Sequence, residues 1–553
     1  MADRVNSLDK RSGITYVYDV DSYWDKAKKQ SRSRRTLVGK IDPSTGQMVP
    51  TDGRGKRRAA ARAQRVDAAF TAIPRQGPVP AIHTARQFYG ATYLLDQIGI
   101  KTGITADLKQ CFPRIYKAIM SLSYFMVLQP ETAISNFERW SELHRHPFGE
   151  NIPSQRSSEL FQSITEKAKM DFFRLQGKRR ANEEYWAYDS TSISSYSRQL
   201  KQVKWGKNRD DEPLPQINLA LIFGEKSGLP FYFRKMAGNI PDVKTLKELL
   251  RELKALGFEK VKLVMDRGYY STDNVNSLYK EHLKFIIGAT TALAYAKAAI
   301  RKHGEEMRQW VHYNEQYRVY YHSETIAWDY MQERPYKGDV IEGEKRMYLH
   351  LFYNPEKALE DEMNFNDFIT RLHQELLTGK RIPEHENAYG KFFTTKVTPV
   401  RGVRVEPIQA AMNKAKSRYG YFVLLSNEVK DPIVALELYR NRDVVEKAFS
   451  DVKDRLNGRR TLVSSEQSLN GKLFVQFLAL IYLSYVKKHM QEHELFKKYT
   501  MQGLLNELER IECFIEPGKA PFIGEVLTKQ VAIYEAMGVC PPQNAASLCE
   551  AGI

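Results

Sequence analysis

The stretch YWAYDSTSIS, residues 185–194, decides the fold, because it has the composition of a buried strand and carries a carboxylate, Asp189, in its middle. An unpaired carboxylate beside a sheet core is costly unless it binds a metal or a cation. Further along the chain, the sequence predicts two more strands and then an amphipathic helix, at Gln216–Phe223, Pro230–Met236 and Asp242–Leu256.

A second aspartate ends the next predicted strand, in KLVMDRGYYS, residues 262–271. The apolar run Val261–Met265 stops at Asp266, and Phe285–Gly288 predicts one more strand. Three strands, a helix, a strand, a helix and a strand indicate a mixed α/β sheet. Taken singly, each aspartate is more often a helix cap or a salt-bridge partner, so the chemistry depends on a third element.

The third element is DPIVALELYRNRDVVEKAFSDVKDRLNG, residues 431–458, which begins with an Asp-Pro cap and ends at an Asn-Gly stop. On one continuous helix four polar side chains fall within about 60° of each other, beside an apolar face. Two alternatives stay open: a solvated stripe of ion pairs, or a second helix that begins at Arg442-Asp443 after a kink. The four residues are Tyr439, Arg442, Glu446 and Lys453.

This spacing resembles the YREK signature of the DDE transposases of bacterial insertion sequences. YDSTSIS and DRGYYS are similar to the segments that hold that family's two metal-binding aspartates, and GNIPDVKTL (238–246) resembles the segment between them. FIIG (285–288) and GRRTL (458–462) also match in position. The resemblance covers roughly residues 185–290 and 420–485.

The resemblance implies a ribonuclease H-like catalytic core, a mixed sheet with helices, interrupted by a β-rich insertion domain. It implies catalytic and metal-binding roles for Asp189, Asp266 and Glu446, which would hold two Mg²⁺ ions, with Mn²⁺ able to substitute. Hard oxygen ligands suit these ions better than zinc. It also implies that Tyr439, Arg442 and Lys453 contact DNA phosphate.

Net charge points to a polyanionic partner. The chain of 553 residues carries a formal charge of +18, and residues 1–75 hold 17 Lys or Arg against 8 Asp or Glu. The β-prone stretches Ile14–Tyr18 and Thr36–Ile41 predict a small sheet, and the basic stretch between them suits DNA phosphate, although a solvated charged face is the alternative. The candidate DNA-binding residues here are Trp24, Lys28, Lys29, Arg32, Arg34, Arg35, Arg57 and Arg58.

Changes in pattern along the chain divide it into an α/β multidomain protein. The expected domains are a basic arm with a small β module and linker (1–76), a helical end-recognition domain (77–180), the first part of the core (181–290), the insertion domain (291–414), the second part of the core with the glutamate helix (415–485), and a helical C-terminal region (486–553). The last is a candidate dimerisation surface, or it completes the core.

Some family members close flanking DNA into a hairpin and stack a flipped base on a tryptophan of the insertion domain. Trp310 and Trp328 lie in the corresponding region. Neither aligns securely, so base stacking is a hypothesis for both, and core packing is the alternative.

Other classes of site find no support in the sequence. The cysteines Cys111, Cys513, Cys540 and Cys549 stand far apart without zinc-type spacing, which favours free thiols. His489 and His493 have i, i+4 spacing but no further ligand, which favours surface histidines. No phosphate loop, signal peptide or long apolar run is evident, so no nucleotide cofactor or membrane is expected, and we expect a cytoplasmic, nucleoid-associated bacterial protein.

The expected function is transposition of DNA. The chain would bind double-stranded insertion-sequence ends, cut them, and join 3′ ends to target DNA, as a homodimer in a synaptic complex. The alternatives are a stand-alone metal-dependent nuclease and a transposase-derived DNA-binding regulator without catalytic activity.

Overall fold

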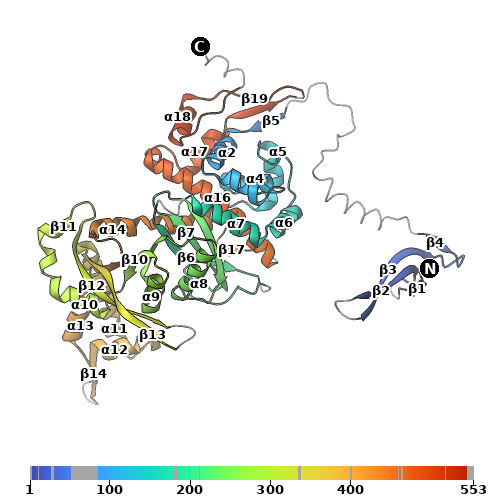
Figure 1. Ribbon diagram of the computed structural model, residues 1–553. Coiled ribbons are helices and arrows are strands. Elements are labelled where there is room, and N and C mark those ends of the chain that lie inside the picture. Colours follow the sequence, from blue (N-terminus) through green and yellow to red (C-terminus); the bar gives the residue numbers. More distant parts are fainter. Residues whose placement is uncertain are drawn as a thin grey trace, which may run out of the picture. The chain divides into compact units, whose positions relative to one another are not determined.

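The computed structural model (Figure 1) forms two units, residues 1–83 and 84–553. The structure describes residues 3–9, 12–25, 30–50, 85–179, 184–197, 200–210, 212–333, 338–398, 402–456, 458, 460–461, 465–516 and 518–544.

The first unit is a four-stranded antiparallel sheet, as the sequence predicts. Its strands are β1 (Asp3–Leu8), β2 (Thr15–Asp25), β3 (Gln30–Ile41) and β4 (Met48–Pro50), in that order. Both long strands extend into the basic stretch, where Trp24 is paired with Ser31. The stretch is therefore largely strand rather than a connecting loop.

The second unit is built on a mixed sheet with the order β11-β12-β13-β16-β10-β9-β6-β7-β8, and β17 (Arg460–Thr461) pairs with β6. Five of its strands are β6 (Trp186–Ser195), β7 (Gln216–Gly224), β8 (Pro230–Ala237), β9 (Lys262–Met265) and β10 (Lys284–Ala289). β6, β9 and β10 run parallel, whereas β6-β7 and β7-β8 are antiparallel. The mixed α/β sheet predicted from the sequence is confirmed.

Two helices connect the parallel strands. α8 (Asp242–Ala255) leads from β8 to β9, and α9 (Thr272–Lys280) leads from β9 to β10. The Tyr188 hydroxyl donates a 3.0 Å hydrogen bond to Thr245, which fixes α8 against β6. Because side chains alternate along a strand, Asp189 faces the opposite side of the sheet.

That opposite face is covered by α16 (Glu466–Glu492), together with α7 (Glu166–Lys178). Phe477 on α16 and Phe173 on α7 pack on Phe233 of β8, with ring centroids 5.1 and 5.4 Å apart. α16 is long and apolar enough to cross a membrane by composition, contrary to the expectation that no such run exists. However, 89% of its apolar window is buried inside the protein, as in a core helix.

The helices before the sheet pack with the C-terminal region. They are α2 (Gly90–Lys101), α3 (Ile104–Cys111), α4 (Tyr116–Leu128), α5 (Phe137–Leu143), α6 (Ser154–Ser163) and α7. β5 (Ala85–Phe88) pairs with β18 (Glu512–Ile515), which pairs with β19 (Phe522–Ile523). Figure 1 shows α17 (Met501–Glu509) and α18 (Thr528–Ala536) beside these helices. The C-terminal region thus shares a core with residues 85–179.

The segment 291–414 continues the large sheet. β13 (Val340–Tyr353) pairs with β12 (Val319–Glu333) on one side and β16 (Tyr421–Ser426) on the other, and β11 (Tyr313–Asn314) lies at the edge. The remaining elements are α10 (Ala294–His303), α11 (Pro355–Thr378), α12 (Glu386–Phe392), β14 (Phe393–Thr398), β15 (Gly402–Pro407) and α13 (Gln409–Lys416). Leu372, Phe392 and Met412 belong to a small core of their own.

The helix that carries the signature is broken, so the expectation of one continuous helix is wrong. α14 (Pro432–Asn441) ends at Arg442, α15 (Asp443–Ser450) follows, and residues Asp451–Arg455 form a short π-helix. The cap at its start is present, since Asp431 accepts hydrogen bonds of 2.8 and 2.9 Å from the backbone N–H groups of Ile433 and Val434. The kinked alternative is the one observed.

Candidate active site

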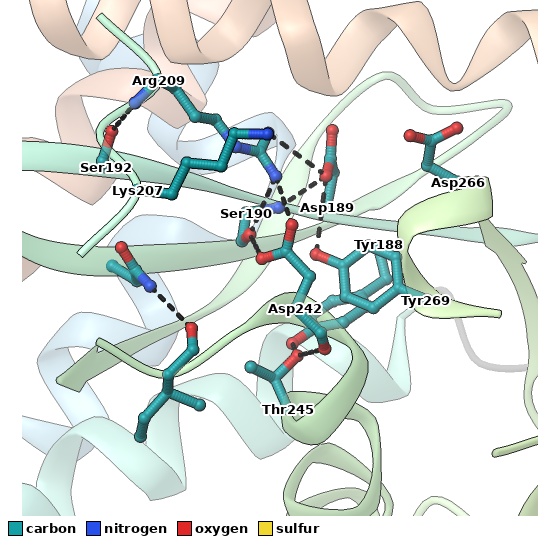
Figure 2. A network of polar contacts seen from close by, with 12 residues as sticks. Tyr188, Asp189, Ser190, Ser192, Lys207, Arg209, Asp242, Thr245, Asp266 and Tyr269 are labelled. Carbon is teal, nitrogen blue, oxygen red and sulfur yellow. Dashed lines mark hydrogen bonds and ion pairs between the residues drawn. The ribbon is translucent and has the colours of Figure 1, made fainter. Parts of the chain in front are cut away.

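Asp189 and Asp266 are neighbours because they follow register partners on parallel strands. Tyr188 on β6 is paired with Met265 on β9, and each aspartate is the next residue of its chain segment. Asp189 is 4% exposed within β6, whereas the Asp266 side chain is 41% exposed beyond the end of β9. Figure 2 shows the two side chains next to each other at the sheet.

Arg442 lies between α14 and α15, and its guanidinium contacts three carboxylates. Nη1 lies 3.3 Å from Oδ2 of Asp189, and Nη2 lies 3.8 Å from Oδ1 of Asp266. Nη2 is also 3.1 Å from Oε1 of Glu446, one turn further along the chain. The Arg442 side chain is 8% exposed. The structure therefore brings all three predicted carboxylates around one buried cationic group.

Tyr439 holds the second aspartate. Its hydroxyl donates a 2.8 Å hydrogen bond to Oδ1 of Asp266, and the Arg442 guanidinium lies 5.2 Å from the centre of the tyrosine ring. Because α14 ends before Arg442 and α15 begins after it, Tyr439 contacts Asp266 from α14, Arg442 contacts it from the junction, and the Glu446 carboxylate comes from α15.

The two aspartates differ in their electrostatic environment. Burial raises the pKa of Asp189 from 3.8 to about 6, with Arg209, the Ser190 N–H and Arg442 opposing the shift and Asp266 adding to it. Burial also acts to raise the pKa of Asp266, but the Tyr439 hydrogen bond and the Arg442 charge outweigh it and lower that pKa. Asp266 is consequently the more firmly ionised of the pair.

A further group at the site, Arg209, is not predicted from the sequence. Its Nη1 lies 3.7 Å from Oδ1 of Asp189, and its Nη2 donates to Asp242 at 2.7 Å and to the Ser190 hydroxyl at 3.3 Å (Figure 2). Ser190 in turn donates to Asp242, at the first turn of α8. The available signal was the charged run KNRDDE, residues 207–212, in a loop between two predicted strands.

Lys453 does not join the three carboxylates. Its Nζ lies 2.7 and 2.8 Å from the two carboxylate oxygens of Asp210, next to Arg209. The π-helix at Asp451–Arg455 has more residues per turn than an α-helix, so Lys453 points in a different direction from the one predicted. This explains why Lys453 does not lie on the same helix face as Tyr439, Arg442 and Glu446. Lys453 instead fixes the loop that presents Arg209.

The donor set suits divalent cations with hard-oxygen preference. Asp189, Asp266 and Glu446 offer six carboxylate oxygens, and in this structure they surround a guanidinium, so the place they enclose already accommodates positive charge. The three residues offer only oxygen atoms, and no sulfur or imidazole nitrogen that would favour a softer metal.

The N-terminal candidates are spread over one strand pair. Trp24 is 62% exposed at the end of β2, and Arg32, Arg34 and Arg35 are exposed on β3. Lys28, Lys29, Arg57 and Arg58 lie outside the described residues.

The two candidate stacking residues differ sharply in exposure. Trp310 is 85% exposed, whereas Trp328 is 6% exposed and donates a 2.8 Å hydrogen bond to Asn276. The described cysteines Cys111, Cys513 and Cys540 are free thiols, as expected, and Cys549 lies outside the described residues.

Comparisons with known proteins give a family. Residues 183–482 match the family described as "Transposase DDE domain", which covers more than half of the chain. Among curated proteins no sequence matches the chain. Six chains of solved structures match. One of these matches is the cryo-EM structure of a piggyBac transposase synaptic complex with hairpin DNA, at 10% identity and a TM-score of 0.32, covering 79% of this chain and 74% of that chain.

The matched range contains every strand of the mixed sheet, the connecting helices α8 and α9, and the three carboxylates. Family membership implies a ribonuclease H-like core for this sheet and a protein that acts on DNA. Members generally use divalent metal ions. The chain therefore belongs to the transposase DDE domain family.

Proposed function

We propose that this protein is a cut-and-paste transposase of the YREK-signature type, which cleaves insertion-sequence ends and joins their 3′ ends to target DNA. The observation that carries the proposal is the convergence of Asp189, Asp266 and Glu446 on one buried guanidinium, although they come from three distant segments. Three carboxylates facing a polyanionic substrate repel it unless cations intervene, so the arrangement serves metal-dependent phosphoryl transfer.

The three carboxylates would hold two Mg²⁺ ions, with Mn²⁺ able to substitute, and these ions would activate the attacking oxygen and stabilise the leaving oxygen. The chain's own residues prepare their ligands. The Ser190 N–H donates to Oδ1 of Asp189 at 2.8 Å, and Tyr439 holds Oδ1 of Asp266. Fixed carboxylates bind metal at a lower ordering cost than mobile ones.

DNA contacts are proposed at two places. Tyr439, Arg442 and Lys453 lie at or beside the carboxylates, where the scissile phosphate would bind, and Arg442 is able to contact phosphate with two nitrogens. The first unit supplies the second place, through Trp24, the arginines of β3, and the basic residues Lys28, Lys29, Arg57 and Arg58. Of the two tryptophans, Trp310 is the proposed base-stacking residue, because the buried face of Trp328 has no room for a base.

The proposed organisation keeps the domain bounds expected from the sequence, except that residues 486–553 complete the core formed by residues 85–179. It includes a homodimer in the synaptic complex and a cytoplasmic, nucleoid-associated location. Both transposon ends must be handled together, which favours two copies of the chain. Contacts between the C-terminal region and residues 85–179, such as the 2.8 Å hydrogen bond from the Tyr534 hydroxyl to the Gly90 carbonyl, support a role of that region in completing the core.

The decisive experiment compares cleavage and strand transfer, on DNA with the element's terminal repeats and Mg²⁺, for wild type, Glu446→Gln and the matched control Glu437→Gln. Glu437 is exposed on α14, nine residues before Glu446. We expect wild type and Glu437→Gln to cut and join, and Glu446→Gln to bind DNA and do neither.

The rivals give different outcomes in the same assay. A stand-alone nuclease would cut but fail to join 3′ ends supplied pre-cleaved. A DNA-binding regulator would bind equally in all three forms and cut in none under any divalent metal.

A further inference from the structure

A second group of potential metal ligands lies away from the carboxylates of the active site. It consists of His303 at the end of α10, with His322 and Glu324 on β12. The ligand atoms of the three side chains lie within 4.8 Å of one another. His322 and Glu324 are two residues apart on a strand, so both point to the side where His303 lies.

The imidazole nitrogens of this group lack partners. Both ring nitrogens of His303 and Nε2 of His322 are shielded from solvent and have no hydrogen-bond partner among the described residues. The nearest carboxylate oxygens are too far for a hydrogen bond, at 3.6 Å from Nε2 to Glu324 and 3.7 Å from Nδ1 to Glu306. Buried polar nitrogens without partners are rare, and they call for a ligand.

The two rings are also held together. Their centroids are 3.8 Å apart with 20° between the ring planes. Because the lone pair of an imidazole nitrogen lies in the plane of its ring, one of the two rings must rotate before both can bind one ion. Two ligand atoms of a tetrahedral zinc ion lie about 3.4 Å apart, so binding needs the ligand atoms, which lie within 4.8 Å of one another, to approach by up to about 1.4 Å.

We propose that His303, His322 and Glu324 bind one borderline divalent metal ion, of which Zn²⁺ is the best fit. Two imidazole nitrogens and one carboxylate oxygen match the ligand preference of zinc and differ from the all-oxygen set of Asp189, Asp266 and Glu446. The fourth position would be filled by Glu306 or by water. Such an ion ties α10, which follows the last parallel strand, to β12 of segment 291–414.

An ion-pair cluster is the competing explanation. A protonated His303 between Glu306 and Glu324 would satisfy the charges without any metal. Metal binding distinguishes the two explanations. A protonated imidazole offers no lone pair to a cation, so the ion-pair cluster would bind no metal.

The test uses the full-length protein, stripped with chelator, and Co²⁺ as a probe. Four-coordinate Co²⁺ with nitrogen ligands absorbs visible light intensely, whereas six-coordinate Co²⁺ on carboxylate oxygens absorbs weakly. We expect one equivalent of Co²⁺ to produce the intense bands and Zn²⁺ to abolish them by displacement. His322→Gln and Glu324→Gln are expected to weaken binding at least about tenfold.

The double variant His489→Gln, His493→Gln serves as the matched control, since it removes a different histidine pair. It should keep the Co²⁺ spectrum. Thermal unfolding gives a second measurement: Zn²⁺ should raise the Tm of wild type and of the control, but not of His322→Gln.

Two outcomes overturn the proposal. One is the absence of intense Co²⁺ bands in wild type, which leaves the ion-pair cluster. The other is a spectrum in His322→Gln and Glu324→Gln equal to that of wild type. Neither outcome bears on transposition, because cleavage and joining with Mg²⁺ are measured separately.

Discussion

The Tyr439 hydroxyl donates a 2.8 Å hydrogen bond to Oδ1 of Asp266, although 173 residues separate them. This contact joins α14 to the end of β9 and helps to keep Asp266 ionised. The hydrogen bond thereby fixes the orientation of the Asp266 carboxylate.

Replacing Tyr439 by Phe should raise the pKa of Asp266 and loosen its orientation. We expect about a tenfold higher Mg²⁺ concentration for half-maximal strand transfer, because a ligand that loses its hydrogen-bonded support binds metal 10–100-fold more weakly. The measurement is a Mg²⁺ titration of activity, with Tyr320→Phe on β12 as control. An unchanged Mg²⁺ requirement would show that the hydrogen bond has no part in metal binding.

Replacing Arg442 by Gln should destabilise the metal-free protein by about 3 kcal/mol, because the buried Asp189 carboxylate then loses a counter-charge. Divalent metal should recover most of that loss, since it supplies the missing positive charge. Urea unfolding with chelator and with Mg²⁺ measures both quantities. An equal loss of stability in the two conditions would contradict the proposed metal site.

The raised pKa of Asp189 predicts a pH dependence of stability in the metal-free protein. The folded-state pKa of about 6 lies above the ordinary value of 3.8, so the stabilising contribution is present below about pH 4 and is lost as pH rises through 6. Its size is roughly 3 kcal/mol, for a shift of about two units. Asp189→Asn should remove this pH dependence from urea unfolding curves, and a variant that retains it would refute the assignment.

Lys453 is paired with Asp210 here, yet it is proposed to contact DNA, and these two roles predict different salt dependence. If Lys453 binds phosphate, Lys453→Met should reduce the slope of log affinity against log salt by about 0.9, while Asp210→Asn should not reduce it. DNA-binding titrations at several salt concentrations give the slopes. Equal effects of both single variants, with no further effect in the double variant, would assign Lys453 to loop support alone.

Strand patterns were sufficient to predict where two of the three carboxylates lie. Asp189 lies within an apolar β-prone run, and Asp266 directly follows another. Because the two strands are parallel neighbours with Tyr188 opposite Met265, the two aspartates lie side by side. Glu446 was reached through a helical spacing that assumed an unbroken helix, and the structure breaks that helix at Arg442. The three carboxylates still meet. Arg442 at the helix junction and Glu446 one turn later both lie near the sheet, where Arg442 contacts Asp189 and Asp266.

The remaining parts of the site depend on contacts that no local pattern encodes. Arg209 contacts Asp189 from a loop, and Lys453 forms an ion pair with Asp210, which is 243 residues away in the sequence. A π-helical turn shifts Lys453 out of the phase that 100° per residue predicts. Likewise, the pairing of β13 with both β12 and β16 places segment 291–414 in the main sheet, which its irregular composition did not indicate.

The pairing of β5 with β18 has a consequence for the order of events during protein synthesis. Arg86 and Glu512 form an ion pair across these strands, 426 residues apart. The ribosome therefore releases residues 85–179 and the entire mixed sheet long before the strand β18 exists. A nascent chain can therefore complete its small N-terminal sheet early, because β1 to β4 pair only with one another, whereas β5 obtains its partner strand only after residue 515 has been made.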